Sequence, residues 1–276
     1  MRALQPDQTG YAVNDGVRIY YEVCGDGDPA VLFVPGFQVM HGRAWKMQVP
    51  SFARWSRMVV YDSRGSGRSD RPATEYGKEA LVGDALAVVD HLGIERFAIL
   101  AISGGARPAV VVAARHPDRV SALVLIGGSI HHQASVTASV PLAERRARML
   151  NDFDGWVRDF WASVFTEPHS TKPREDGWEY TSTTDALTLI AASEHGWAVT
   201  EARAEVELVR CPVLIIHGTN DGRVPYAYAE ELHRLLPQSR LVTIGGGGHF
   251  PSVRDPVRVN LLARDFLERS AARKGA

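Results

Sequence analysis

The 276-residue sequence predicts an α/β fold: a mostly parallel central sheet of about eight strands, an N-terminal antiparallel hairpin, flanking helices and an inserted helical cap. Short apolar runs of strand length alternate with segments of helical periodicity, the order that builds parallel sheets covered by helices on both faces. This alternation stops between residues 129 and 209, where helical patterns occur without a buried strand. We therefore predict a core domain formed by 1–128 and 210–276, with a cap inserted at 129–209.

The chain opens with the hairpin. Residues 11–13 and 17–23 are strand-like and flank Asn14-Asp15-Gly16, whose residues tolerate the positive φ angles of tight turns. Continuous apolar runs then predict buried strands, and amphipathic segments between them predict helices. The predicted strands after the hairpin are 30–34, 58–61, 97–102, 120–126, 213–217 and 241–244. The predicted core helices are 45–55, 78–92, a segment directly after Ser103, 226–236 and 256–268.

The predicted cap contains three helical patterns, at 142–150, 156–165 and 184–195. They are separated by breaks such as Glu167-Pro168 and Lys172-Pro173. Each tryptophan in this region could pack in a small core of the cap or face a substrate pocket. These tryptophans are Trp156, Trp161, Trp178 and Trp197.

Ser103 stands at the junction between the strand 97–102 and an Ala- and Val-rich helical segment. Its neighbours Ala101, Gly104 and Gly105 are small, as a strained strand-to-helix bend requires, because larger side chains would strike the strand or the helix. Such a bend lifts the hydroxyl clear of the sheet and aims the partial positive charge of the helix N-terminus at any group bound there. The alternative is that Ser103 only caps the helix, a position that favours serine.

Two more polar residues follow the ends of predicted strands. Asp221 comes shortly after the strand 213–217, and His249 follows the strand 241–244 and a run of glycines. The carboxyl ends of parallel strands share one edge of a sheet, so Ser103, Asp221 and His249 are expected to meet there. A serine hydroxyl needs a base within hydrogen-bonding reach, and an imidazole base needs a carboxylate to hold its tautomer. The three residues supply that relay.

With these residues in this order, the chain resembles the α/β-hydrolase fold family, in its serine hydrolase branch with a helical cap. Residues 62–69, Asp-Ser-Arg-Gly-Ser-Gly-Arg-Ser, are similar to the family's D-x-R-G-x-G-x-S turn. The resemblance implies that Ser103 is the nucleophile, His249 the general base and then acid, and Asp221 the orienting carboxylate. Another branch carries its acid after the strand that here ends at residue 126, but the loop 127–130 has no carboxylate.

The resemblance also implies an oxyanion hole made by the backbone N–H groups of Phe37 and Gly104. The chain departs from the family pattern at Pro35-Gly36, where relatives usually carry His-Gly, and at Ala101, where they usually carry glycine. Neither departure removes an oxyanion donor. Among other histidines, His217 is expected only to cap its strand, and His131 could line the pocket or be solvated. The residues predicted to line a substrate pocket are Gly36, Ile130, His131, Trp156, Trp161, Trp197 and Phe250.

Composition narrows the possible partners. A formal net charge of -1 gives no footprint for nucleic acid or an anionic membrane, and no apolar run is long enough to span a bilayer. Cys24 and Cys211 form neither a disulfide framework nor a metal set. We therefore expect a cytoplasmic monomer or homodimer that needs no cofactor or metal and binds a small molecule with an apolar portion.

The predicted function is hydrolysis of an ester, thioester or lactone through an acyl-serine intermediate. Dehalogenases and epoxide hydrolases of the same family use an aspartate in the nucleophile position, so Ser103 argues against both. Two alternatives stay open. One is cleavage of a carbon–carbon bond in a 1,3-diketone or ring-fission product by the same three residues. The other is a ligand-binding or signalling protein with little turnover.

Overall fold

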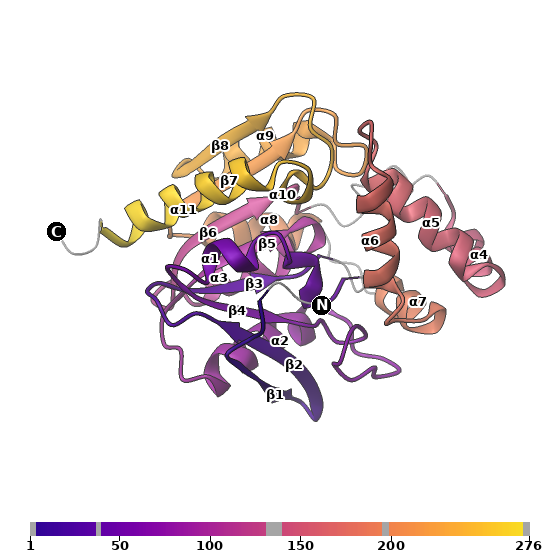
Figure 1. Ribbon diagram of the computed structural model, residues 1–276, viewed down its shortest axis with the longest axis horizontal. Coiled ribbons are helices and arrows are strands. Elements are labelled where there is room, and N and C mark those ends of the chain that lie inside the picture. Colours follow the sequence, from indigo (N-terminus) through magenta and orange to yellow (C-terminus); the bar gives the residue numbers. More distant parts are fainter. Residues whose placement is uncertain (1–3, 37–39, 131–139, 195–198, 273–276) are drawn as a thin grey trace.

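The computed structural model describes residues 4–36, 40–130, 140–194 and 199–272. A single eight-stranded sheet crosses these residues in the order β1-β2-β4-β3-β5-β6-β7-β8 (Figure 1). Strand β2 is antiparallel to β1 and β4, and the other neighbouring pairs are parallel, which confirms the predicted sheet and hairpin. The strands are β1 (Gln8–Asn14), β2 (Val17–Cys24), β3 (Ala30–Val34), β4 (Arg57–Tyr61), β5 (Phe97–Ile102), β6 (Val120–Ile126), β7 (Val213–Gly218) and β8 (Ser239–Ile244).

Helices cover both faces of the sheet, which explains why the central strands are apolar at nearly every position. All of β5 is buried, because one face packs against α2 and α3 and the other against α1 and α11. The first face is covered by α2 (Lys78–His91), α3 (Ala106–Arg115), α8 (Val199–Leu208) and α9 (Tyr226–Leu235). The second is covered by α1 (Val49–Phe52) and α11 (Pro256–Ala272), which follows the short helix α10 (Pro251–Arg254).

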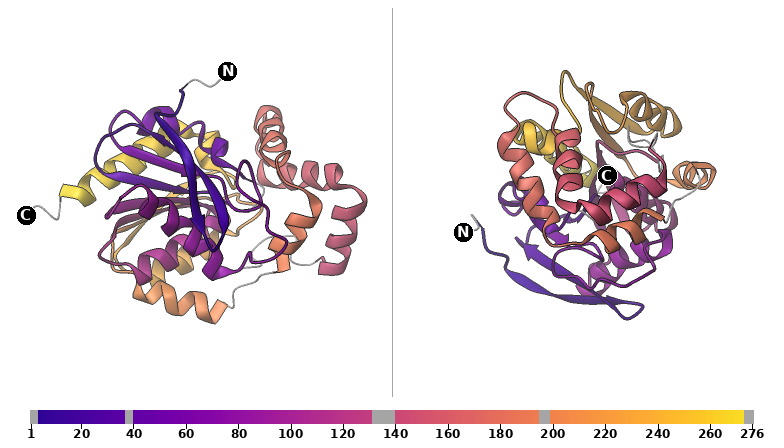
Figure 2. Two further views of the ribbon diagram at one scale, coloured as in Figure 1. Left: turned by 90° about the horizontal axis from the view of Figure 1, so that it is seen from below. Right: turned by 90° about the vertical axis from the view of Figure 1, so that its right-hand side faces the viewer.

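Among the described residues between β6 and β7, four helices lie apart from these two layers, on the right-hand side of Figure 1 and of the left-hand view of Figure 2. We call them the cap. They are α4 (Leu142–Asn151), α5 (Phe153–Val164), α6 (Thr171–Thr181) and α7 (Ala186–Glu194). Helix α8 lies inside the range predicted for the cap, but it packs against α3, and its Val206 belongs to the apolar core.

Two local predictions were wrong. The helix expected at 45–55 is divided into a 3-10 turn, η1 (Gly42–Trp45), and α1, because Pro50 lacks an N–H and occupies the start of a new helix. The break expected at Lys172-Pro173 lies inside α6. Pro173 occupies the first turn of that helix, where backbone N–H groups have no intrahelical partner, so the proline removes no hydrogen bond.

Within the described ranges, no helix combines the length and apolar character needed to cross a membrane. The same residues contain no group of three or more His, Cys, Asp or Glu side chains arranged to hold a metal ion.

Candidate active site

The chain bends sharply at Ser103, directly after β5. Ser103 adopts φ = 51°, in the left-handed region that residues other than glycine rarely occupy. Gly105 permits the bend, because a Cβ at that position would lie 2.2 Å from the carbonyl oxygen of Pro35. Helix α3 begins at the next residue, Ala106. Backbone strain of this kind persists where the surrounding packing enforces it, and it is concentrated at functional sites.

The side chains of Ser103, His249 and Asp221 form a hydrogen-bonded chain. Oγ of Ser103 lies 2.8 Å from Nε2 of His249, and Nδ1 of His249 lies 2.8 Å from Oδ2 of Asp221. A carboxylate can only accept, so Nδ1 carries the ring proton and Nε2 accepts the hydroxyl proton of Ser103. His249 and Asp221 are buried, whereas Ser103 is partly exposed. The chain therefore ends at a hydroxyl that another molecule can reach.

The carboxylate of Asp221 accepts four hydrogen bonds. Oδ1 accepts the backbone N–H groups of Arg223 and Val224, both at 2.8 Å. Oδ2 accepts Nδ1–H of His249 and, at 3.1 Å, Nε2–H of His217. Burial opposes ionisation, but hydrogen bonds from the two imidazoles outweigh it and hold the pKa of Asp221 well below its usual range. Asp221 is therefore an anion at neutral pH and can stabilise a charged imidazole.

His217, at the end of β7, is a site residue for which the sequence predicted only a strand-capping role. Its side chain is fully buried, and Nε2–H is shared between Asp221 and the carbonyl oxygen of Val224 at 2.9 Å. Nδ1 is buried and has no hydrogen-bond partner among the described residues. The available signal was a histidine near the end of a strand that leads directly to Asp221, since such a side chain can reach the carboxylate.

His249 is buried, with 3% of its surface exposed. Burial lowers the pKa of its imidazole, although hydrogen bonding to Asp221 acts in the opposite direction. Phe250 contributes to this burial, because its ring stacks on the imidazole with centroids 4.8 Å apart. The loop after β6 presses against the same residue: Gly127 has φ = 56°, and a Cβ there would lie 2.5 Å from the carbonyl oxygen of His249. The ring is therefore neutral at neutral pH, as a general base must be.

The turn at 62–70 anchors Gly42, in the segment that follows β3. Oδ1 of Asp62 accepts the N–H of Gly42 at 2.6 Å, and Oδ2 accepts the N–H of Arg68 at 2.8 Å. Ser69 closes the turn by donating its hydroxyl to the carbonyl oxygen of Asp62 at 2.6 Å. Because Gly42 begins η1, Asp62 fixes the chain just beyond the segment that carries Phe37.

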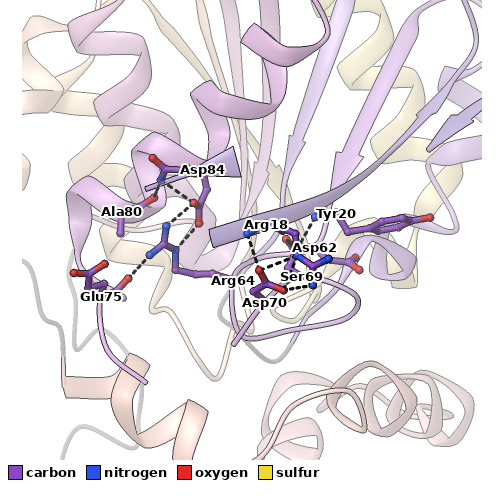
Figure 3. Close-up of polar contacts among 10 residues, drawn as sticks. Arg18, Tyr20, Asp62, Arg64, Ser69, Asp70, Glu75, Ala80 and Asp84 are labelled. Carbon is purple, nitrogen blue, oxygen red and sulfur yellow. Dashed lines mark hydrogen bonds and ion pairs between the residues drawn. The ribbon is translucent and has the colours of Figure 1, made fainter. Parts of the chain in front are cut away.

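Arg64 holds the same turn to α2. Its Nε and Nη2 donate to the two carboxylate oxygens of Asp84, each at 2.7 Å, and Nη1 donates to the carbonyl oxygen of Glu75 at 2.6 Å (Figure 3). Arg64 and Asp84 are each 1% exposed. Asn14 completes the cluster by donating to Asp84 at 2.9 Å, so the motif in this turn forms a buried structural network.

Arg223 connects the loop of Asp221 to the cap. Its Nη1 donates to Oγ of Ser163 at 3.2 Å, and the guanidinium lies 4.7 Å from the ring centroid of Phe160 on α5. Burial lowers the pKa of Arg223 to about 10. The sequence offered only the closeness of Arg223 to Asp221 as a signal for this contact.

The predicted oxyanion and pocket residues lie in different surroundings. Phe37, His131 and Trp197 fall outside the described residues. Gly36 lies beside Ser103, since a Cβ at this glycine would be 3.6 Å from Cβ of Ser103. Gly104 directly follows Ser103 in the bend.

The other predicted pocket residues range from buried to partly exposed. Ile130 and Phe250 are each 3% exposed. Trp161 is 1% exposed and donates its ring N–H to Thr181 at 2.7 Å within the cap. Trp156 is partly exposed and stacks between Phe153 and Phe160 along α5.

The eight-stranded sheet, the bend at Ser103 and the hydrogen bonds from Ser103 through His249 to Asp221 together point to one class of protein, the α/β hydrolases. Residues 29–172 and 142–256 match the alpha/beta hydrolase fold family in two overlapping segments, so the chain belongs to that family.

Several relatives are similar to this chain over nearly its whole length. Serine hydrolase BPHL from Homo sapiens is 29% identical, covering 93% of this chain and 85% of BPHL. The 2-hydroxymuconate semialdehyde hydrolase of Pseudomonas sp. (strain CF600) is 26% identical, covering 93% of each chain. The solved structure of Est816, described as an N-acyl homoserine lactone degrading enzyme, has a TM-score of 0.82 and 26% identity. It covers 93% of this chain and 100% of its own.

Proposed function

We propose that the protein is a serine hydrolase that cleaves an ester, thioester or lactone of an apolar small molecule through an acyl-serine intermediate. The observation that carries the proposal is the chain of 2.8 Å contacts from Ser103 through His249 to Asp221. An alcohol, a neutral imidazole and a permanent carboxylate in this order are the groups that acyl transfer requires. Membership of the α/β-hydrolase family and the name of the relative BPHL support the same reaction class.

Each step of the proposed reaction uses one of these groups. Nε2 of His249 takes the hydroxyl proton as Oγ of Ser103 attacks the substrate carbonyl, and the negative charge moves to the carbonyl oxygen. The N–H groups of Gly104 and Phe37 are the donors proposed for that oxyanion. The imidazolium, stabilised by Asp221, then protonates the leaving alcohol or thiol. Water activated by His249 attacks the acyl-serine and releases the acid, which restores Ser103.

The apolar portion of the substrate is proposed from the cap. Phe153, Trp156 and Phe160 stack along one side of α5 and are only partly buried. Burial of apolar groups is the main source of affinity in concave ligand sites, and partly exposed aromatic rings suit that purpose. Est816, whose description names lactone degradation, supports inclusion of lactones among the substrates to test.

Carbon–carbon bond hydrolysis is a second candidate. It is favoured by the 26% identity to a 2-hydroxymuconate semialdehyde hydrolase, a name whose substrate contains no ester. Ser103, His249 and Asp221 would take the same roles. Ester and 1,3-diketone panels assayed on the same preparation separate the two reactions by which bond is broken.

The proposal is tested with a fluorophosphonate probe and the variant Ser103→Ala. We expect the folded wild-type protein to be labelled at Ser103. We also expect Ser103→Ala to lose turnover of a short nitrophenyl ester by about 10³-fold or more. An unlabelled wild-type protein would favour a binding protein with little turnover, and unchanged turnover by the variant would reject Ser103 as the nucleophile.

A further inference from the structure

His249 follows four consecutive glycines, 245–248, that connect β8 to the base. Glycine loses more backbone entropy on ordering than any other residue, so such a segment does not hold a defined path by itself. The ring of His249 nevertheless lies 2.8 Å from both Ser103 and Asp221. Contacts from neighbouring elements must therefore fix the glycine segment.

The segment that carries Asp221 holds the first part of the glycine run. Gly246 N–H donates to Oγ1 of Thr219 at 2.8 Å, and Asn220 N–H donates to the carbonyl oxygen of Gly247 at 2.9 Å. Gly218 permits this approach, because a Cβ there would lie 2.2 Å from the same carbonyl oxygen. The carbonyl oxygen of Gly248 also packs against Gly218, but the hydrogen bonds from this segment end at Gly247, one residue before the neighbour of His249.

Gly248 is held by the cap. Its N–H donates to Oε1 of Glu167 at 2.9 Å, and Glu167 lies in the loop between α5 and α6. Oε2 of Glu167 is buried and has no hydrogen-bond partner among the described residues. A buried carboxylate oxygen without a partner is unfavourable for folding, so stability alone does not account for a glutamate at this position.

The loop that carries Glu167 is itself docked beside the base. Arg254 of α10 donates to the carbonyl oxygens of Pro168, at 2.9 Å, and His169, at 3.3 Å. Helix α10 begins at Pro251, two residues after His249. The cap loop 167–169 is therefore bound to the helix that directly follows His249.

We propose that Glu167 is a positioning residue: it fixes Gly248 and so keeps the imidazole of His249 aligned with Ser103 only while the cap is docked. The inference rests on the proposed function, since it concerns the base of that reaction. It adds a role for the cap beyond covering the substrate, because the cap supplies the acceptor that orders the loop of the base.

The test compares Glu167→Ala with Glu167→Gln. The amide oxygen of Gln can still accept the N–H of Gly248, whereas alanine leaves that N–H without its acceptor. We expect Glu167→Ala to reduce kcat for a nitrophenyl ester, and the rate of fluorophosphonate labelling of Ser103, by about 10-fold. KM should change by less than about 2-fold, and Glu167→Gln should stay within about 2-fold of wild type in both readouts.

Glu179→Ala is the matched control. Glu179 also joins the cap to the core, through an ion pair of 3.2 Å with Arg43. This pair is exposed and includes no residue of the segment 245–249 that leads to His249. We expect its removal to leave both rates unchanged.

A second substitution, in the glycine segment, distinguishes loss of the alignment of His249 from damage to the fold of the cap. A Cβ added at Gly245 would have no atom within 4 Å, and this residue does not need a positive φ, so Gly245→Ala should stiffen the glycine segment without a clash. We expect Glu167→Ala/Gly245→Ala to recover about 2- to 5-fold of the lost rate.

The outcomes are distinguishable. Failure of the wild-type protein to react with the probe overturns the proposed function itself. Normal labelling of wild type with an unchanged rate in Glu167→Ala overturns the positioning role alone. Equal losses in the Ala and Gln variants, without recovery by Gly245→Ala, also overturn it, because they would assign Glu167 to folding of the cap.

Discussion

Asp221 and Asp62 are both buried, and each accepts two backbone N–H groups, yet their pKa values shift in opposite directions. Burial raises the pKa of Asp62, and the N–H groups of Arg68 and Gly42 do not offset it. At Asp221 burial acts in the same sense on the pKa, but hydrogen bonds from two histidines reverse the outcome. The two carboxyl groups therefore differ in the direction of their pKa shifts because Asp221 has two imidazole donors, and not because of burial or backbone hydrogen bonds.

The opposite shifts imply opposite effects of pH on stability. Asp221 ionises more readily in the folded chain, so it contributes stability above its unfolded pKa of about 3.9, and this contribution is lost as pH falls below that value. Asp62 ionises less readily when folded, so its contribution declines as pH rises from about 3.9 through its raised folded pKa. Folding therefore favours the charged form of Asp221 and the neutral form of Asp62.

Asp221→Asn is expected to have the largest effect. An amide nitrogen would face the two imidazole N–H donors, which forces His249 toward the tautomer that cannot accept the proton of Ser103. We expect ester turnover to fall by about 10³-fold or more, with KM little changed. Steady-state kinetics on the folded variant measure this, and a loss below about 10-fold would remove Asp221 from the relay.

Arg64→Met affects the turn at 62–70. It leaves the buried carboxylate of Asp84 without its bidentate partner, and we expect a loss of about 3–5 kcal/mol in the free energy of unfolding. Urea denaturation measures the loss, and Arg64→Met/Asp84→Leu should recover part of it by removing the unpaired charge. A loss under about 1 kcal/mol would show that the ion pair does not hold the turn.

Asp62→Asn tests the direction of the shift in the turn. Its amide nitrogen would meet a backbone N–H, so we expect a loss of about 1–3 kcal/mol in the free energy of unfolding and less than about a 10-fold change in turnover. The stability gap to wild type should be widest at or below about pH 3.9 and should narrow as pH rises from there, because only wild type bears the cost of ionising residue 62. A gap that is constant from about pH 3 to 8 would contradict the raised pKa.

His217→Leu removes one of the two imidazole donors to Asp221. The carboxylate then interacts more strongly with His249, so the pKa of the base should rise. In wild type, acylation should increase with pH through a midpoint below about 6.5, because burial lowers the pKa of His249. We expect His217→Leu to move that midpoint upward by about one pH unit.

His217→Gln is the control for this shift. Its side-chain amide can still donate to Asp221, so the midpoint should stay near that of wild type. An unchanged profile in the leucine variant, with only the maximal rate reduced, would assign His217 to packing.

Local sequence pattern predicted the buried strands well, but it missed one helix and one long-range contact. Strands such as 97–102 were predicted well, because a run of apolar residues has few other stable environments than a buried sheet. Helix α6 was missed, because Pro173 looks like a break until its place in the first helical turn is known. Likewise, Glu167 reads as an ordinary loop residue, since its partner Gly248 lies far away in the chain.

The amino-acid pattern alone was enough to predict the α/β order, the interruption by helices at 129–209 and the places of Ser103, Asp221 and His249 after strand ends. These features follow from periodicity and from the rule that parallel strands share an edge. Two contacts could be known only from the folded chain: His217 shares a carboxylate oxygen of Asp221 with His249, and Glu167 of the cap accepts a hydrogen bond from Gly248. Hydrogen bonds act over about 3 Å, and no local pattern says which distant groups will come that close.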